Sequence, residues 1–262
     1  MMRTLKASYG IAGTLFMIAP LLAILPLSFN GGMLLSYPMN GVSLRWFEEL
    51  LTNNAWRLAI FNSLFIGFVS ATLSVILGTL AALGLRGHSG GLYGLCRMVF
   101  LLPMVAPVVV LGVGMQILMS RMGLTNSYPG VIIAHTVVAV PFVVVSVSAS
   151  LAGIDRTLER AAASLGAPPW TVFRRLTLPL AMPGLQSGAV FAFATSLDEV
   201  ILTLFLGGAN QRTLAREMFS QLRDNVSPAI AAAAFMFIVG TTTLSVLTIA
   251  VRGRRVGLTT AN

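Results

Sequence analysis

The chain has 262 residues, of which 56% are hydrophobic and only 10% are charged. Soluble domains carry about 25% charged residues, so this composition excludes an ordinary soluble domain and indicates a membrane protein. The formal net charge of +9 would suit a nucleic-acid-binding protein, but the arginines are scattered between long apolar runs, so we exclude nucleic acid as a partner.

Side chains that carry catalysis or bind metals are scarce. Cys96 is the only cysteine, which excludes an intrachain disulfide and a multi-cysteine metal site, and His88 and His135 are too far apart for a helical metal motif. Lys6 is the only lysine, and no glycine-rich turn precedes it, so the chain lacks the phosphate-binding loop of an ATPase. We therefore expect no cofactor and no enzymatic activity here. If ATP powers this protein, another chain binds the nucleotide and its Mg²⁺.

Six apolar runs alternate with polar segments along the chain. A helix needs about 20 residues to cross roughly 30 Å of hydrocarbon, and each run reaches that length. We expect an all-α membrane protein with six transmembrane helices in one domain over residues 1–262, and the spans cover residues 8–29, 58–85, 98–120, 130–152, 183–206 and 227–251. Prolines and glycines within the spans favour close packing of kinked helices, and hinges are the alternative.

The segment Asn30–Trp56 between the first two spans is polar and rich in turn residues. Its stretch Ser43–Glu49 predicts a short helix at the membrane interface. Aromatic residues such as Trp46 are typical of the headgroup region. We also retain Trp46 as a candidate residue of a substrate path.

The loop charges predict the orientation. With the N-terminus in the cytoplasm, eleven basic residues lie inside and six outside, which obeys the positive-inside rule. The loop that follows the fourth span, residues 153–182, then faces the cytoplasm, and both termini lie there too. A multi-pass protein of the bacterial inner membrane is expected.

This 153–182 loop is basic and lies between two apolar spans, so it must stand in water. Leu158, Ala161, Ala162 and Leu165 share one face of a predicted helix. Asp155 is the expected N-cap and Gly166 the expected residue after the C-cap. A second helix is expected to begin at Pro168–Pro169, to carry Trp170 and Phe173 on one face, and to end at Leu178–Pro179. The alternative is a solvated loop whose arginines serve only the membrane topology.

Two adjacent acids, Asp198 and Glu199, occur late in the fifth span. An acid at mid-bilayer costs about 2.5–3.5 kcal/mol on insertion scales, so intramembrane acids indicate a functional site. Adjacent helical residues point about 100° apart, so we expect one acid to line a substrate path, with Thr195 nearby, while the other pairs with an arginine or backbone amides. The alternative places both acids at the outer interface or in a structural network. His135 and Asn62–Ser63 are expected to make hydrogen bonds between helices.

The order Ala161-Ala162, Gly166, Leu178-Pro179 and Pro183-Gly184 resembles the cytoplasmic "EAA" loop of the membrane subunits of bacterial ABC importers. In that family the loop forms the coupling helix that seats in a groove of the ATPase. Arg160 stands where the family has its glutamate, and Glu159 lies one residue earlier. The resemblance implies a type I ABC importer permease fold, and it implies that ATPase coupling involves Glu159, Arg160, Ala161, Ala162, Leu165, Gly166, Ala167, Trp170, Phe173 and Pro179.

Ser196-Leu197-Asp198-Glu199-Val200, Gly207-Gly208 and Ser227-Pro228 resemble the second permease subunit of spermidine/putrescine-type importers, as do Ser43–Trp46 and Asn62–Leu64. This similarity implies polyamine transport, although relatives in the same subgroup carry opines, amino acids or phosphonates. It also implies a heterodimer with a second permease, two ATPase subunits and a periplasmic substrate-binding protein.

Two other classes compete with this interpretation. A secondary transporter or channel driven by an ion gradient would use Asp198 or Glu199 as its ion site. A structural membrane assembly factor would have no substrate path at all.

Overall fold

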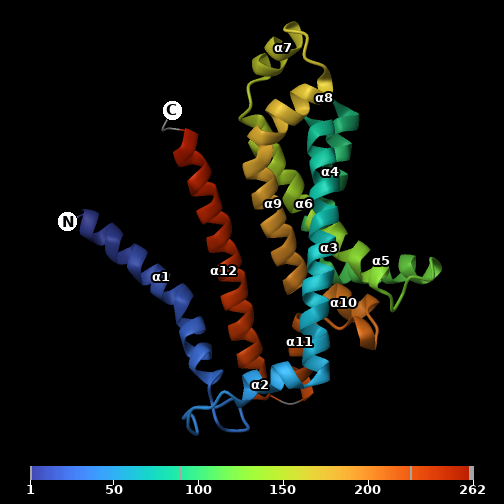
Figure 1. Cartoon of the computed structure of the whole chain (residues 1–262). Helices are drawn as coiled ribbons and strands as arrows, with labels where there is room; N and C mark the ends of the chain where they lie inside the picture. The colour runs from blue at the N-terminus through green and yellow to red at the C-terminus, as the bar shows by residue number, and fades with distance from the viewer. Residues whose placement is uncertain (1, 89, 225, 260–262) are drawn as a thin grey trace. The chain divides into compact units, whose positions relative to one another are not determined.

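The computed structural model describes residues 2–88, 90–224 and 226–259, and the side chains of residues 2–5, 7, 224 and 244–259 lie outside that description. The regular structure of these residues is helical, which confirms the predicted all-α fold class (Figure 1). The elements are α1 (Met2–Leu27), α2 (Arg45–Thr52), α3 (Asn54–Leu85), α4 (Gly91–Val105), α5 (Val108–Arg121), α6 (Tyr128–Ala152), α7 (Arg156–Ser164), α8 (Pro169–Val172), the π-helix η1 (Phe173–Thr177), α9 (Leu178–Asp198), α10 (Ile201–Leu206), the 3-10 helix η2 (Ala209–Gln211), α11 (Leu214–Asp224) and α12 (Pro228–Thr259).

Within the described residues, four helices are long and apolar enough to cross a membrane, or five if α4 and α5 form one broken span. The apolar part of α12, Pro228–Thr243, is shorter, and the rest of the predicted 227–251 span lies where side chains are not described. The prediction of six spans is consistent with this pattern. The contacts divide the chain into two compact units, residues 1–57 with 217–243 and residues 58–216 with 244–262, so a single domain stays a prediction.

The first unit holds the predicted interfacial helix, which is α2. Its Trp46 is buried, and the indole N–H donates to the carbonyl of Asn30 at 2.7 Å. Phe47 packs against Phe29 and Phe235, with ring centroids 5.3 and 5.7 Å apart, and such aromatic pairs add about 0.5–1.5 kcal/mol each. Aromatic packing therefore fixes α2 within this unit.

The second unit is built around α6, the most deeply buried helix. Val131, Ala139, Val143 and Val147 are completely buried along it. Helix α9 lies directly against α6, because a Cβ atom at Gly184 would approach the Ser150 hydroxyl to 2.5 Å. Small residues at such contacts let helix backbones come close, which is how helices associate in a bilayer without a hydrophobic driving force.

The predicted span 98–120 is not one straight helix. Helices α4 and α5 meet at an angle of 107°, and the break lies at Ala106–Pro107. The proline ring excludes Ala106 from the helical region, and Ala106 accordingly has φ −67° and ψ 139°. Prolines and glycines in the sequence indicated a kink, and beyond the bend α5 packs against α10.

The predicted end of the second loop helix at Leu178–Pro179 is wrong. The helix that starts at Pro169 continues through η1 into α9. The Leu178 N–H donates to the Phe173 carbonyl, five residues back, and this wider turn places Pro179 in the first turn of α9, where its missing N–H is tolerated. The 153–182 loop is thus joined to a membrane helix without an intervening flexible segment.

Candidate functional site

The first helix of the 153–182 loop, α7, has well-formed ends. The Asp155 carboxylate accepts from the Thr157 N–H at 2.8 Å, and this backbone hydrogen bond lowers the pKa of Asp155. At the other end Gly166 has φ +84°, its N–H donates to Ala163, and the Ala167 N–H donates to Ala162. This pair of bonds is the Schellman motif, which satisfies carbonyls at the end of a helix. The predicted cap residues are confirmed.

Glu159 fastens α7 to the membrane helices. Its carboxylate lies 2.6 Å from a guanidinium nitrogen of Arg86, next to the end of α3, and accepts from the Thr177 hydroxyl at 2.7 Å. Partial burial raises the pKa of Glu159, but the hydrogen bonds from Thr177 and Arg86 outweigh it, so the net pKa lies below its ordinary value. The acid is therefore ionised at neutral pH and ties together three chain segments.

Arg86 and Arg156 complete this anchor. A second Arg86 nitrogen donates to the Ile154 carbonyl at 3.0 Å, and an Arg156 nitrogen donates to the Arg86 carbonyl at 2.7 Å. These contacts were not predicted, because in the sequence Arg86 is one of the eleven basic residues on the predicted cytoplasmic side and nothing local marks its partner. Arg86 follows the end of a span, and the basic 153–182 loop contains a single glutamate, so these two features of the sequence could have indicated the pair.

The loop exposes two large apolar side chains. The exposed fraction is 89% for Leu165 and 67% for Trp170, and the Trp170 ring packs at a tilt against the half-buried Phe173, with ring centroids 5.4 Å apart. Figure 1 shows α7 and α8 at one end of the second unit, with α5 and α10 at the other. Of the other predicted coupling residues, the structure leaves Arg160, Ala161, Gly166 and Pro179 exposed and Ala162 and Ala167 half-buried.

The two acids of the fifth span lie where the helix breaks. Helix α9 ends at Asp198, and α10 begins at Ile201 after two non-helical residues. The Glu199 carboxylate accepts from the Leu202 N–H at 2.9 Å and thereby satisfies a donor in the first turn of α10. The side chain of Asp198 is exposed, and its carboxylate makes no hydrogen bond or ion pair with any other residue that the structure describes. The prediction that one of the two acids pairs with backbone amides is observed for Glu199.

A buried polar network lies beside this break. One ring nitrogen of His135 lies 2.7 Å from the Ser196 hydroxyl, and the other lies 3.0 Å from the Thr203 hydroxyl. Ser70 on α3 donates to Ser196 at 3.0 Å, so the network joins α3, α6, α9 and α10. The prediction that His135 is a hydrogen-bonded structural residue is confirmed, whereas the roles of Ser196 and Thr203 were missed.

The connection between α10 and α11 is held by two side chains of α3. Asn62 donates to the carbonyls of Asn210 and Arg212, each at 2.8 Å, and the Ser63 hydroxyl accepts from the Leu214 N–H at 2.7 Å. The predicted structural role of Asn62–Ser63 is thus observed, and the partners are backbone groups of η2, of the residue that follows it and of the start of α11. Thr195 is half-buried in α9, and the indole N–H of Trp46 is hydrogen-bonded to the Asn30 carbonyl in the first unit. That either residue lines a substrate path stays a prediction.

The sequence matches the family model of the binding-protein-dependent transport system inner membrane component over residues 74–256. The putrescine transport system permease protein PotI of Escherichia coli K12 is 35% identical, covering 86% of this chain and 83% of PotI. The spermidine/putrescine permease PotC of Haemophilus influenzae is 32% identical over 88% and 90% of the two chains. The molybdenum transport permease ModB of Mycobacterium bovis is 34% identical, with 88% of each chain covered.

A solved structure shares the fold. A chain of a bacterial ABC transporter involved in the import of the acidic polysaccharide alginate superimposes with a TM-score of 0.75, at 16% identity, over 97% of this chain and 95% of that chain. The fold suggested by the Ala161–Gly184 pattern is therefore confirmed. The chain belongs to the family of binding-protein-dependent transport system inner membrane components.

Proposed function

We propose that this chain is one of two permease subunits of an ATP-driven importer and forms half of its translocation path. Two ATPase subunits bind ATP and Mg²⁺, and a periplasmic binding protein delivers the substrate. The chain itself carries no cofactor and catalyses no reaction. Both termini and the 153–182 loop face the cytoplasm, as the distribution of arginines supports.

The observation that carries this proposal is the construction of the 153–182 loop. Its inner side is tied to α3 by the Glu159–Arg86 ion pair, and its chain continues without interruption into α9. Its outer side exposes Leu165 and Trp170 to solvent. A rigid element with an apolar outer face can dock into an ATPase groove and transmit a rigid-body shift to the membrane helices.

The substrate class is the polyamines or a related small solute with amine groups. PotI and PotC are named for putrescine and spermidine, and they cover most of this chain. The exposed Asp198 at the helix break supports a cationic substrate, because an amine beside a carboxylate offsets the desolvation of both charges. Irregular backbone at membrane depth is tolerated where it borders a water-filled cavity, which also favours a path at this break.

ModB, which is named for molybdenum transport, gives a specific alternative within the same class of importer. In neutral oxygenated water molybdenum is present as the molybdate anion. An unpaired carboxylate in the path would repel an anion. Opines, amino acids and phosphonates are further substrates of the same class.

Uptake into proteoliposomes tests the proposal. The permease pair, the ATPases and the binding protein are reconstituted with ATP, and uptake of labelled putrescine is compared with that of labelled molybdate. We expect putrescine uptake that stops when ATP is left out. Uptake of molybdate alone would reject the substrate, and uptake driven by an ion gradient without the ATPases would reject the transporter class.

A further inference from the structure

A basic pocket lies at the end of the second unit that carries α7 and α8. Its walls come from the ends of α3 and α6, the start of α4 and the segment before α7, and they include Arg86, Arg97, Arg156, Ser148, Leu85 and Leu151. Its volume is ≈ 290 Å³, far above the roughly 15 Å³ that one water needs. We call it the three-arginine pocket. No acidic side chain lines it.

Two of the three guanidinium groups are held in place by the protein. Arg86 is fixed by Glu159 and the Ile154 carbonyl, and Arg156 is fixed by the Arg86 carbonyl. The guanidinium group of Arg97 makes no hydrogen bond or ion pair with the described residues. One carboxylate, that of Glu159, pairs with Arg86 and also acts on Arg156, so the three arginines keep an excess of positive charge. The pocket is therefore arranged to receive an anion.

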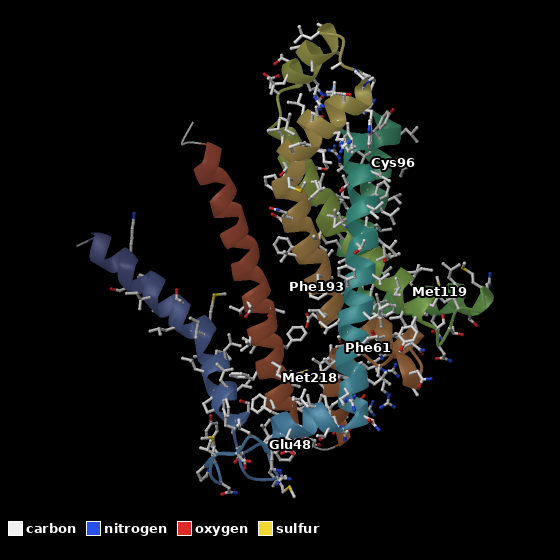
Figure 2. The ribbon with its side chains drawn as sticks, viewed as in Figure 1. Glu48, Phe61, Cys96, Met119, Phe193 and Met218 are labelled. Carbon is white, nitrogen blue, oxygen red and sulfur yellow. The ribbon has the colours of Figure 1, made fainter. Side chains whose placement is uncertain are left out.

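The surroundings favour an anion attached to a lipid. Leu92, Leu95, Met98 and Val99 on α4 flank Arg97 and are 52–70% exposed. Figure 2 shows Cys96, the neighbour of Arg97, on α4 near the end that carries α7 and α8. Acyl chains can lie along this apolar face while a phosphate enters the pocket. Basic pockets between membrane helices are known to bind anionic headgroups in this way.

We propose that the three-arginine pocket binds the phosphate of an anionic membrane lipid, such as phosphatidylglycerol, with Arg97 as its free ligand. A guanidinium forms paired hydrogen bonds with phosphate oxygens, which a zwitterionic headgroup with its own ammonium satisfies less well. The bound lipid would stabilise the Arg86–Glu159 ion pair from the membrane side. This inference does not depend on the transported substrate.

Native mass spectrometry of the assembled transporter, extracted from vesicles of phosphatidylcholine with phosphatidylglycerol, tests this site. Arg97→Gln should weaken phosphatidylglycerol binding about tenfold. Arg175→Gln removes an exposed arginine that does not line the pocket and should leave binding unchanged. Equal binding by wild type and Arg97→Gln, or an equal loss in Arg175→Gln, would overturn the proposal.

Two further arms identify the ligand. Ser148→Met fills the pocket and keeps every arginine, so it should also weaken lipid binding, and it replaces Arg97→Gln if that variant fails to fold. Inorganic phosphate should not match phosphatidylglycerol in raising the unfolding temperature. Stabilisation by phosphate alone would assign the pocket to a free anion and reject the lipid. Cross-linking of the native Cys96 to an ATPase subunit would assign the pocket to a protein contact and would also reject the lipid.

Discussion

At the scale of single residues, Glu159 has the clearest energetic role, because one carboxylate joins α7, α3 and η1. Its pKa is lowered in the folded protein, so the ion pair contributes its full stabilisation above the ordinary value of 4.5 and loses it as the pH falls through the lowered value. Glu159→Gln should lower stability by roughly 1 kcal/mol at neutral pH.

Thermal unfolding in detergent between pH 7 and pH 3 measures this effect. The difference between wild type and Glu159→Gln should be constant above pH 5 and should shrink as the pH falls below 4.5. Glu48→Gln, on an exposed carboxylate of α2, is the control (Figure 2). A difference that does not shrink at all below pH 4.5 would show that charge is not what Glu159 supplies.

Gly166 has a left-handed backbone conformation and also lies on the surface that is proposed to dock to the ATPase. Its φ of +84° strains most side chains, while a Cβ atom there would meet nothing within 4 Å. Gly166→Asp places a charge on the outer face of the loop and should reduce ATP-dependent uptake at least about tenfold, or ~1.4 kcal/mol of lost contact. Gly166→Asn tolerates the same φ without the charge and should retain most of the uptake. Normal transport by Gly166→Asp would refute the coupling role.

Asp198 and Glu199 provide a matched pair in the transport assay. Asp198→Asn should raise the KM for putrescine about tenfold, because a hydrogen bond between charged groups contributes about 1.5–3 kcal/mol, and should affect a neutral solute much less. Glu199→Gln weakens the contact with the Leu202 N–H and should lower the unfolding temperature instead. Equal effects of Asp198→Asn on both solutes would make Asp198 a structural acid.

At the scale of elements, the bend between α4 and α5 is held by the packing of α5 on α10. A Cβ atom at Gly112 would approach the Phe205 ring to 2.6 Å, whereas one at Gly114 would meet nothing within 4 Å. Gly112→Val should therefore destabilise the protein by about 1–3 kcal/mol, and Gly114→Val should not. The unfolding temperature of the two variants separates a tight helix contact from a general effect of valine. A similar loss in both would contradict the contact.

The same scale shows why helix positions were predictable and helix bends were not. The apolar runs and the caps at Asp155 and Gly166 are local signals, and the observed helices follow them. Pro107 and Pro179 are both prolines within helical runs, yet one breaks the helix and the other is absorbed by a π-helical turn. Which outcome occurs depends on whether neighbouring residues can supply the replacement hydrogen bonds.

At the scale of the whole molecule, the orientation in the membrane follows from the proposed function. In a background where Cys96 is replaced by serine, Leu165→Cys should react with a membrane-impermeant maleimide only from the cytoplasm. Arg121→Cys, at the exposed end of α5, should react only from the periplasm. Labelling of Leu165→Cys from the periplasm would invert the topology and remove the loop from any ATPase.

The helical membrane fold, the loop with its caps and the family can be inferred from the amino-acid sequence, because hydrophobic length, capping residues and motif spacing are properties of neighbouring residues. The pairing of Glu159 with Arg86, 73 positions away, and the hydrogen bonds of His135 to Ser196 and Thr203 become visible in the folded chain alone. The folded chain likewise separates the capped Glu199 from the exposed Asp198. Such pairs depend on how helices distant in the chain pack together, and a local pattern carries no record of which side chains that packing brings within hydrogen-bond distance.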